Sequence, residues 1–231
     1  MKNIFFLLIT FSYSINAQEV LKDSTRVQNL EEVIVSSIRV DDNIPIAYNN
    51  LSKDEISDRN LGQDLPILLN FLPNVVTTSD AGAGIGYTGI RIRGINSQST
   101  NVTINGIPYN DAESNLTYWV DLPDFSSSIE NLQVQRGIGT SVNGSGAFGA
   151  SINILTDNIS QDPFFESNNT LGSYNTYKNT FRFSTGLLND VFEFSGRLSK
   201  IDSDGYIDRA CLLYTSPSPR DATLSRMPSS A

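Results

Sequence analysis

Two stretches in the last third of the chain alternate strictly between apolar and polar residues. In residues 191–201, VFEFSGRLSKI, one face carries Phe192, Phe194, Gly196 and Leu198, and the other carries Glu193, Ser195, Arg197 and Ser199. Residues 180–186, TFRFSTG, place Phe181 and Phe183 opposite Arg182 and Ser184. A period of two predicts β-strands. The pattern fits a sheet with one solvated face, and it also fits a barrel wall that is apolar outside and polar inside.

The middle of the chain begins with two short helical patterns. Ser52 and Glu55 have the spacing of a capping box, which predicts the start of a helix. A second predicted helix has Pro66 in its first turn, Pro73 at its end, and apolar positions at Leu65, Leu68, Leu69 and Leu72. Five predicted strands follow, at residues 74–78, 90–95, 101–107, 129–137 and 149–156. Helices followed by short strands favour a small α+β domain.

The stretch EEVIVSS, residues 31–37, is a predicted strand without a local partner. Val33, Ile34 and Val35 favour extended backbone, but the flanking segments are polar and broken by Asp41, Asp42 and Pro45. A strand with an unpaired edge offers backbone donors and acceptors to another chain. It either joins this protein's own sheet or is kept free for a partner.

The N-terminus has the pattern of a secretory signal. Lys2 precedes an apolar run at residues 4–9, and Ala17 is a small residue at a suitable cleavage position. The alternative, a helical anchor, would need an apolar run of about 20 residues. The sequence therefore predicts an exported protein that begins near Gln18, and export favours the barrel interpretation of the alternating strands.

Composition narrows the classes of function. The chain of 231 residues has no histidine and a net charge of -9. Without imidazole, hydrolase triads and zinc sites are disfavoured, and the negative charge disfavours nucleic acid as a partner. Cys211 is the single cysteine, so we predict no disulfide framework.

Residues 211–231, CLLYTSPSPRDATLSRMPSSA, differ from everything before them. They contain three of the nine prolines and end in a polar, Ser-rich run without a period. One interpretation is a disordered tail. The other, which we favour, is translated sequencing-adapter read-through, which would mean that the natural gene continues past Ala210. We therefore leave this tail out of the reasoning about the fold.

A glycine motif at residues 84–89 matches a dinucleotide-binding fingerprint. Gly84, Gly86 and Gly89 have the GxGxxG spacing, and Asp111 follows at a suitable distance. That fingerprint requires a helix to begin inside the loop, whereas IRIRGI after it reads as a strand. We therefore favour a Gly-rich loop between strands over a nucleotide site.

Residues 30–156 resemble the N-terminal region of TonB-dependent outer-membrane receptors. LEEVIVSS resembles the TonB box, and LPILLNFLPNVV resembles the LPxLLxxxPGV helix and strand of the family. IRIRGINSQSTNVTINGIPYND and IENLQVQRGIGTSVNGSGAFGASINIL resemble the two RG-containing plug motifs. The motifs occur in the family's order. Asn105, Ile138 and residues 143–144 depart from the family pattern without removing it.

The resemblance implies a fold and a domain order. The expected fold is an α+β plug domain with a small mixed sheet, followed by the first antiparallel strands of an incomplete outer-membrane β-barrel. The expected domains are a signal peptide at 1–17, a periplasmic extension with the TonB box at 18–45, the plug at 46–157, the first barrel strands at 158–210 and a non-native tail at 211–231. Membrane strands take about 9 to 11 residues, so residues 163–210 would supply three or four, and we expect a truncated receptor.

The resemblance also implies roles for particular residues. The segment that pairs with TonB by strand addition would be Glu32, Val33, Ile34, Val35 and Ser36. Arg93 and Arg136 would hold the plug by pairing with barrel glutamates. The ligand would meet two loops of the plug apex, with contacts from Tyr87, Tyr109, Asn110, Asp111, Tyr118 and Trp119; packing of Tyr118 and Trp119 against the barrel wall is the alternative. No catalytic residue, metal site or cofactor is predicted.

The function implied by the resemblance is import of a scarce nutrient complex across the outer membrane of a Gram-negative bacterium. Ferric siderophore, haem and cobalamin complexes are the expected ligand types, TonB the expected protein partner, and outer-membrane lipid the expected surroundings. Two other classes stay open at this point. One is a secreted plug-like binding module without transport, and the other is a nucleotide-dependent oxidoreductase that uses residues 84–89.

Overall fold

The computed structural model describes residues 39–40, 44–138, 146–156, 158–189, 192–208 and 210–220, with the backbone alone at 215–220. All of these residues belong to one compact unit, Glu32–Ala231. The predicted signal at 1–17 and the predicted TonB-binding residues 32–36 lie outside the described residues, and so does the end of the tail beyond 220.

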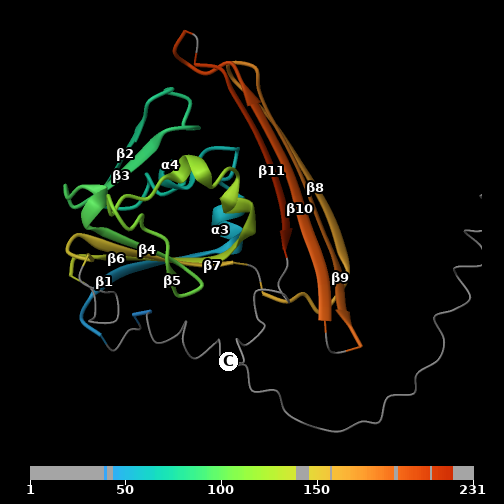
Figure 1. Cartoon of the computed structure of the whole chain (residues 1–231), viewed down its shortest axis with the longest axis horizontal. Helices are drawn as coiled ribbons and strands as arrows, with labels where there is room; N and C mark the ends of the chain where they lie inside the picture. Colours follow the sequence, from blue (N-terminus) through green and yellow to red (C-terminus); the bar gives the residue numbers. More distant parts are fainter. Residues whose placement is uncertain are drawn as a thin grey trace, which may run out of the picture. The chain divides into compact units, whose positions relative to one another are not determined.

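A mixed five-stranded sheet forms the base of the first half of the chain (Figure 1). Its order is β1 (Ala47–Ser52), β6 (Ile129–Arg136), β7 (Ala150–Thr156), β4 (Thr100–Ile104) and β5 (Ile107–Pro108). Strands β4 and β7 are parallel, and the other neighbouring pairs are antiparallel. The prediction of a small mixed sheet is therefore confirmed.

One face of this sheet packs on the hydrophobic core. Alternate residues of its two central strands are fully buried there, namely Leu132, Val134, Ile152 and Ile154. Helix α3 (Lys53–Ser57) and helix α4 (Leu65–Leu68) contribute Ile56, Leu65 and Leu69 to the same core. Three short 3-10 helices complete this half: η1 (Ser97–Ser99), η2 (Trp119–Asp121) and η3 (Phe125–Ser128).

The helix signals of the sequence have structural counterparts. The Ser52 hydroxyl accepts from the Glu55 amide, and the Glu55 carboxylate accepts from the Ser52 amide, so the predicted capping box is present. Helix α4 has its proline in the first turn, as expected. It ends at Leu68, one turn before the predicted end at Leu72, because the chain then turns toward strand β2.

A separate hairpin joins β2 (Val75–Ser79) to β3 (Thr88–Ile92). The glycine motif lies in its loop, where Gly84 and Gly86 have φ values of 77° and 100° that favour glycine. A strand follows this loop, as the sequence predicts, and the helix that a dinucleotide site needs is not there.

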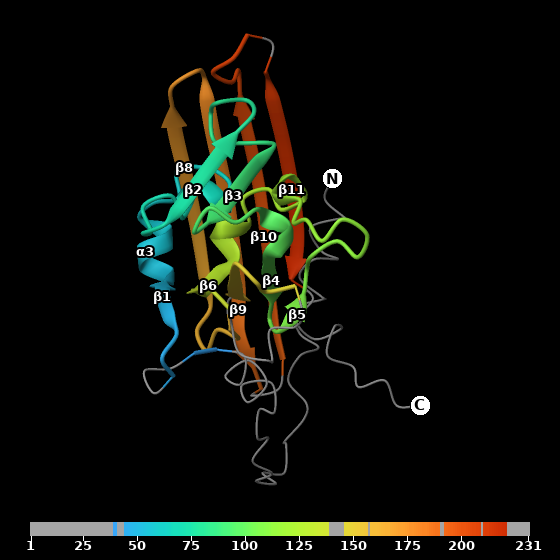
Figure 2. The ribbon, with the colours of Figure 1, turned by 90° about the vertical axis from the view of Figure 1, so that its left-hand side faces the viewer.

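The second half of the chain is a sheet of four long antiparallel strands, which we call the long-strand sheet (Figure 2). Its strands are β8 (Phe164–Gly172), β9 (Thr176–Leu188), β10 (Phe192–Ser203) and β11 (Leu212–Arg220), each paired with the next. The predicted alternation is confirmed in β9 and β10. Apolar residues are exposed on one face, including Phe181, Phe194 and Leu198, and polar residues are buried on the other, including Arg182, Glu193 and Arg197.

Two strands differ from the sequence prediction. Strand β1, AYNNLS, was not predicted because it lacks β-branched residues, and it forms through pairing with β6. Strand β11 uses residues 212–220 of the predicted tail, a segment left out of the sequence-based reasoning about the fold. Its alternate prolines, Pro217 and Pro219, suit its position at the edge of the sheet. Among the described residues, no helix has the length and apolar character needed to cross a membrane.

Candidate functional site

A buried aspartate joins the first half of the chain to the long-strand sheet. Asp124 lies just before η3 in left-handed conformation, with φ of 50°, and its side chain is 1% exposed. Its Oδ1 lies 2.7 Å from Lys178 Nζ of β9, and its Oδ2 lies 3.2 Å from Arg197 Nη1 of β10. The side chains of Lys178 and Arg197 are 2% and 7% exposed, so all three charges are buried together.

Hydroxyl groups from the same two strands complete the contacts of this carboxylate. Thr180 Oγ1 and Ser199 Oγ donate to Asp124 Oδ2 at 2.7 and 2.6 Å. Arg197 Nη1 also donates to the backbone oxygen of Asp124 at 2.6 Å. We call Asp124, Lys178, Thr180, Arg197 and Ser199 the Asp124 cluster. Because β9 and β10 are antiparallel neighbours, their polar faces present all four partners to one carboxylate.

Residues on the Asp124 side hold the cluster in place. Ser127 Oγ donates to Asp124 Oδ1 at 2.6 Å, and Lys178 Nζ donates to Asn60 Oδ1 at 2.9 Å. Gly62, with φ of 113°, lies beside the Lys178 stem, and a Cβ at this position would be 3.4 Å from Lys178 Cδ. The positive φ favours glycine at this position, and a Cβ there would make an ordinary van der Waals contact with the lysine stem.

The electrostatic balance of the cluster favours the ionised carboxylate. Burial by itself would raise the pKa of Asp124, but the attraction of Lys178 and the hydrogen bonds from Lys178, Ser127 and Ser199 outweigh it and leave the pKa below its usual value. Removing one partner from such a buried group costs about 3–5 kcal/mol, because the remaining charges stay out of water. Breaking the cluster is therefore costly, and the cluster is a specific connection between the plug and the long-strand sheet.

The two arginines predicted to hold the plug lie elsewhere. Arg93 is exposed and has φ of 54°, and its Nη1 would be 2.7 Å from a Cβ placed on Gly137. Arg136 is half-buried and donates to the Pro73 oxygen at 3.4 Å. Both therefore belong to the same end of the domain. Among the described residues neither forms an ion pair, so their pairing with barrel glutamates stays a prediction.

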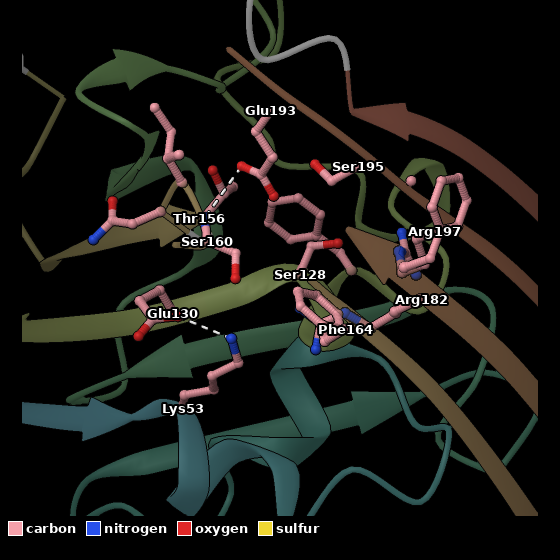
Figure 3. Close-up of a pocket in the computed structure, with 15 residues that line it drawn as sticks. Lys53, Ser128, Glu130, Thr156, Ser160, Phe164, Arg182, Glu193, Ser195 and Arg197 are labelled. Atoms are coloured by element: carbon pink, nitrogen blue, oxygen red, sulfur yellow. Dashed lines mark hydrogen bonds and ion pairs between the residues drawn. The ribbon is translucent and has the colours of Figure 1, made fainter. Parts of the chain in front are cut away.

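A cavity of about 360 Å³ lies next to the cluster, between the first half of the chain and the long-strand sheet (Figure 3). Its walls include Glu130, Arg182, Glu193, Ser195 and Arg197. Figure 3 draws two of its contacts, from Lys53 Nζ to Glu130 at 3.0 Å and from the Ser160 amide to Glu193 at 3.2 Å. Charges of both signs face this space, which makes it suitable for water and polar groups.

The six predicted ligand residues divide into two groups. Tyr87 and Tyr118 are 66% and 44% exposed and have rings free to meet a ligand. Asp111 is also near the surface, where it accepts from the amide and hydroxyl of Ser114, while the Ser114 hydroxyl lies 3.4 Å from the Tyr118 hydroxyl. These hydrogen bonds lower the pKa of Asp111. The loop thus brings Asp111 and Tyr118 together.

The other three predicted ligand residues have structural roles. Asn110 accepts from the Val102 amide and donates to the oxygens of Thr100 and Asn115, so its amide fixes the loop. Tyr109 packs against the core, and burial raises its pKa. Trp119 is 3% exposed within the core. We therefore place Trp119 with the core and not with the exposed loop surface.

Sequence reasoning missed the centre of the cluster. Asp124 in LPDF has the signature of an ordinary turn residue, and its strand partners are 54 or more positions away. The available signal was the polar face of β9 and β10, where Arg197 and Ser199 were identified in the correct positions. Buried cations on that face require a carboxylate partner, but the sequence does not say which one.

The first half of the chain matches a known protein family. Residues 40–151 match the family model of the TonB-dependent receptor plug domain. The chain is 31% identical to the vitamin B12 transporter BtuB of Vibrio vulnificus (strain YJ016) over 206 residues. This alignment covers 87% of the chain and 31% of BtuB. The chain therefore spans about a third of the length of this curated relative.

Solved structures show the same fold. The alcaligin outer-membrane receptor FauA from Bordetella pertussis aligns with a TM-score of 0.54 and 17% identity, covering 70% of this chain and 27% of FauA. The ferripyoverdine receptor of Pseudomonas aeruginosa aligns with a TM-score of 0.53 and 16% identity, covering 70% and 21%. The predicted fold class, a plug-like mixed sheet followed by antiparallel strands, is confirmed. Residues 40–151 are a TonB-dependent receptor plug domain, and the chain is a member of the TonB-dependent receptor family.

Proposed function

We propose that the chain is part of an outer-membrane receptor that imports a scarce nutrient complex, of ferric siderophore, haem or cobalamin type, with energy delivered through TonB. The names of its relatives support this class, since they include a vitamin B12 transporter and receptors for alcaligin and ferripyoverdine. In this proposal residues 1–17 direct export, the plug closes the transport path, and β8 to β10 begin the wall around it.

The observation that carries the proposal is the inverted burial of the long-strand sheet. Phe165, Phe194 and Leu198 are 73%, 60% and 57% exposed, while Glu193 and Arg197 are nearly buried. In water this arrangement would leave a large apolar face uncovered, whereas lipid is the natural surroundings for such a face. The polar face of the same strands meets the plug through the Asp124 cluster.

The cluster also explains why a transporter of this kind needs external work. Three buried charges and several hydrogen bonds connect the plug to two strands, so separation or local rearrangement at that point is costly. We propose that TonB pairs edge to edge with Glu32 to Ser36 and pulls on the plug from its N-terminal side. Regions of low local stability then open before strongly connected ones.

Ligand capture is proposed for the exposed loops of the plug. Tyr87 and Tyr118 offer aromatic faces, and Asp111 offers a fixed polar group beside Tyr118. Aromatic rings with a hydrogen-bonding edge suit planar or partly apolar ligands.

A proline substitution tests the role of the TonB-binding segment. In the complete receptor that carries this chain, Ile34→Pro removes a backbone donor from the middle of the proposed pairing strand. We expect uptake to fall to background and ligand binding to stay unchanged, measured with whichever of labelled ferric siderophores, haem and cyanocobalamin binds. Ile34→Val keeps the backbone donor and is the matched control. Normal uptake by Ile34→Pro would contradict the TonB assignment, and failure of every ligand in the panel to bind would contradict the ligand class.

A further inference from the structure

The residue Val40 lies just before the five-stranded sheet of β1, β6, β7, β4 and β5, which we call the plug sheet, and its backbone is hydrogen-bonded to the side chain of Gln133. The backbone N–H of Val40 donates to Gln133 Oε1 at 2.9 Å, and Gln133 Nε2 donates to the backbone oxygen of Val40 at 2.9 Å. The backbone N–H and the carbonyl oxygen of Val40 are thus both paired with the side-chain amide of Gln133. Val40 is 3% exposed and Gln133 is 1% exposed, so this contact is buried.

The side chain of Gln133 is fixed by its own neighbours. It donates a second hydrogen bond to Asn50 Oδ1 of β1 at 2.8 Å, and it accepts from Gln135 Nε2 at 2.8 Å. Arg39, next to Val40, donates to Asn131 Oδ1 at 2.7 Å. Gln133 therefore connects three pieces of the plug: the entering chain, edge strand β1 and central strand β6.

The sequence pattern of the sheet explains why an amide is available there. Leu132 and Val134 of β6 point into the hydrophobic core, so Asn131, Gln133 and Gln135 occupy the opposite face. Strand β7 continues the pattern, with Ser151 and Asn153 on the opposite face. Asn131 is half-buried, the other four polar residues are almost fully buried, and a buried amide requires partners. The peptide groups of Val40 satisfy that requirement for Gln133.

We infer that the polar face of the plug sheet is a docking site for the segment that enters the plug, and that Gln133 is the positioning residue that anchors this segment at Val40. The anchor rests on the observed contacts, while its mechanical role rests on the proposed function of Glu32 to Ser36. Val40 comes four positions after Ser36, and four residue steps span at most about 14 Å when the chain is extended. A force that pulls on the proposed TonB-binding segment is therefore transmitted to Gln133 once this short length of chain is extended. Gln133 in turn transmits it to β6 and β1.

Amide hydrogen exchange in the complete receptor, without TonB or ligand, tests the anchor. In the wild type we expect the Val40 amide to exchange at least about tenfold more slowly than in an unstructured peptide, because it is buried and bonded. Gln133→Leu removes both bonds at similar size and should eliminate this protection. Leu132 and Ile152 amides, measured in the same sample, report that the sheet is still folded.

Two further variants separate the two bonds. Gln133→Glu keeps an acceptor for the Val40 N–H and loses the donor to the Val40 oxygen, so Val40 protection should be largely retained. Gln135→Leu is the matched control on the same strand and face, and it should leave most of the Val40 protection in place. An unprotected Val40 amide in the wild type, or equal protection in the wild type and in folded Gln133→Leu, would overturn the anchor.

The anchor and the proposed function fail in different ways. Ile34→Pro should abolish uptake while Val40 stays protected, since residue 34 is not part of the contact with Gln133. If Val40 is protected and uptake is insensitive to Ile34→Pro, the anchor stands and the TonB role of residues 32–36 is wrong. If Val40 is unprotected and Ile34→Pro still abolishes uptake, the anchor is wrong and the TonB role of residues 32–36 stands.

Discussion

The plug sheet and the long-strand sheet use the same two-residue alternation, but the apolar face is buried in the first and exposed in the second. In the plug sheet, Leu132 and Ile152 are 0% exposed and form the core. In the long-strand sheet, Phe194 and Leu198 are more than half exposed, and Arg197 is 7% exposed. Alternation defines two faces of a strand, but the surroundings decide whether the apolar face is buried. In the plug sheet the polar face is buried as well, as Gln133 and Asn153 show, whereas in the long-strand sheet only the polar face is.

Two buried aspartates of the plug, at the starts of α4 and η3, differ in their surroundings. Asp64 of the plug is buried and accepts from the Thr88 hydroxyl, without a cation among the described contacts, and burial raises its pKa to about 7. Asp124 lies at the boundary with the long-strand sheet, where Lys178 and Arg197 are within ion-pair distance and its pKa is lowered. Of these two aspartates, the one with the lowered pKa is therefore the one beside Lys178 of β9 and Arg197 of β10.

Removing the carboxylate of Asp124 should have the largest effect on this arrangement. Asp124→Ala leaves Lys178 and Arg197 buried without their main partner, and we expect a loss of about 3–5 kcal/mol in the free energy of unfolding of the plug. Denaturant titration of the complete receptor, followed by a probe in the plug, measures it. Asp202→Ala is the matched control, because the Asp202 side chain is 54% exposed and its Oδ2 lies 3.8 Å from Lys200 Nζ. A loss for Asp124→Ala no greater than for the control would show that the cluster does not hold the plug.

Asp64 predicts that stability falls as the pH rises, because its pKa is raised, whereas the pKa of Asp124 is lowered. The pKa of Asp64 is about 7 in the folded protein and 3.8 in the reference state, so the folded state binds more protons in between. The contribution of Asp64 to stability is therefore complete below about pH 4 and is lost as the pH rises to about 7, at up to about 1.4 kcal/mol per pH unit. Asp64→Asn should remove this fall, and stability measured from pH 4 to 8 would show it. Exposed Asp80, changed to Asn, is the control, and a parallel profile for wild type and Asp64→Asn would contradict the account.

A charge on the apolar face distinguishes lipid from water as its surroundings. Phe194→Arg should destabilise the receptor in bilayers by about 2–4 kcal/mol if this position lies near the bilayer centre. On a sheet that faces water the same change would have little effect. Folding titrations in lipid vesicles measure the difference. Phe194→Leu keeps the apolar character and should cost much less, so equal effects of the two variants would argue against a lipid-facing position.

The smallest effect is expected where an ion pair is partly exposed. Lys53 Nζ and Glu130 Oε2 are 3.0 Å apart, and their side chains are 40% and 39% exposed. Glu130→Gln should cost about 0.2–1 kcal/mol, less at high salt, because water screens the pair. Unfolding titrations at low and high salt would check it. A cost comparable with that of Asp124→Ala would mean that burial does not explain the strength of the cluster.

Much of the fold could be predicted because its signals are local. The capping box at Ser52 and Glu55, the strand patterns of the plug and the alternation in β9 and β10 each lie within a few neighbouring residues. Strand β1 could not be predicted, since AYNNLS becomes a strand only by pairing with β6, more than 75 positions away. Strand β11 was missed because its composition resembles a tail, although backbone pairing with β10 tolerates it.

The candidate site was harder to predict than the fold. Exposed loop residues such as Tyr87 and Tyr118 could be selected by residue type, but type does not distinguish them from Trp119, which is in the core. The partners of Asp124 come from two strands that follow it by 54 to 75 positions, and only the pairing of β9 with β10 brings them together. The role of Gln133 likewise depends on a contact across 93 positions.

The most direct test of the inverted sheet is the accessibility of single spin labels along β10. In the receptor reconstituted in lipid, labels at Phe192, Phe194, Gly196 and Leu198 should be reached readily by oxygen, which concentrates in the hydrocarbon core. Labels at Glu193, Ser195, Arg197 and Ser199 should be protected from both oxygen and a water-soluble relaxing agent, because these positions face the plug. An alternation with period two and this phase is the predicted result. The opposite phase, or no alternation, would contradict the account.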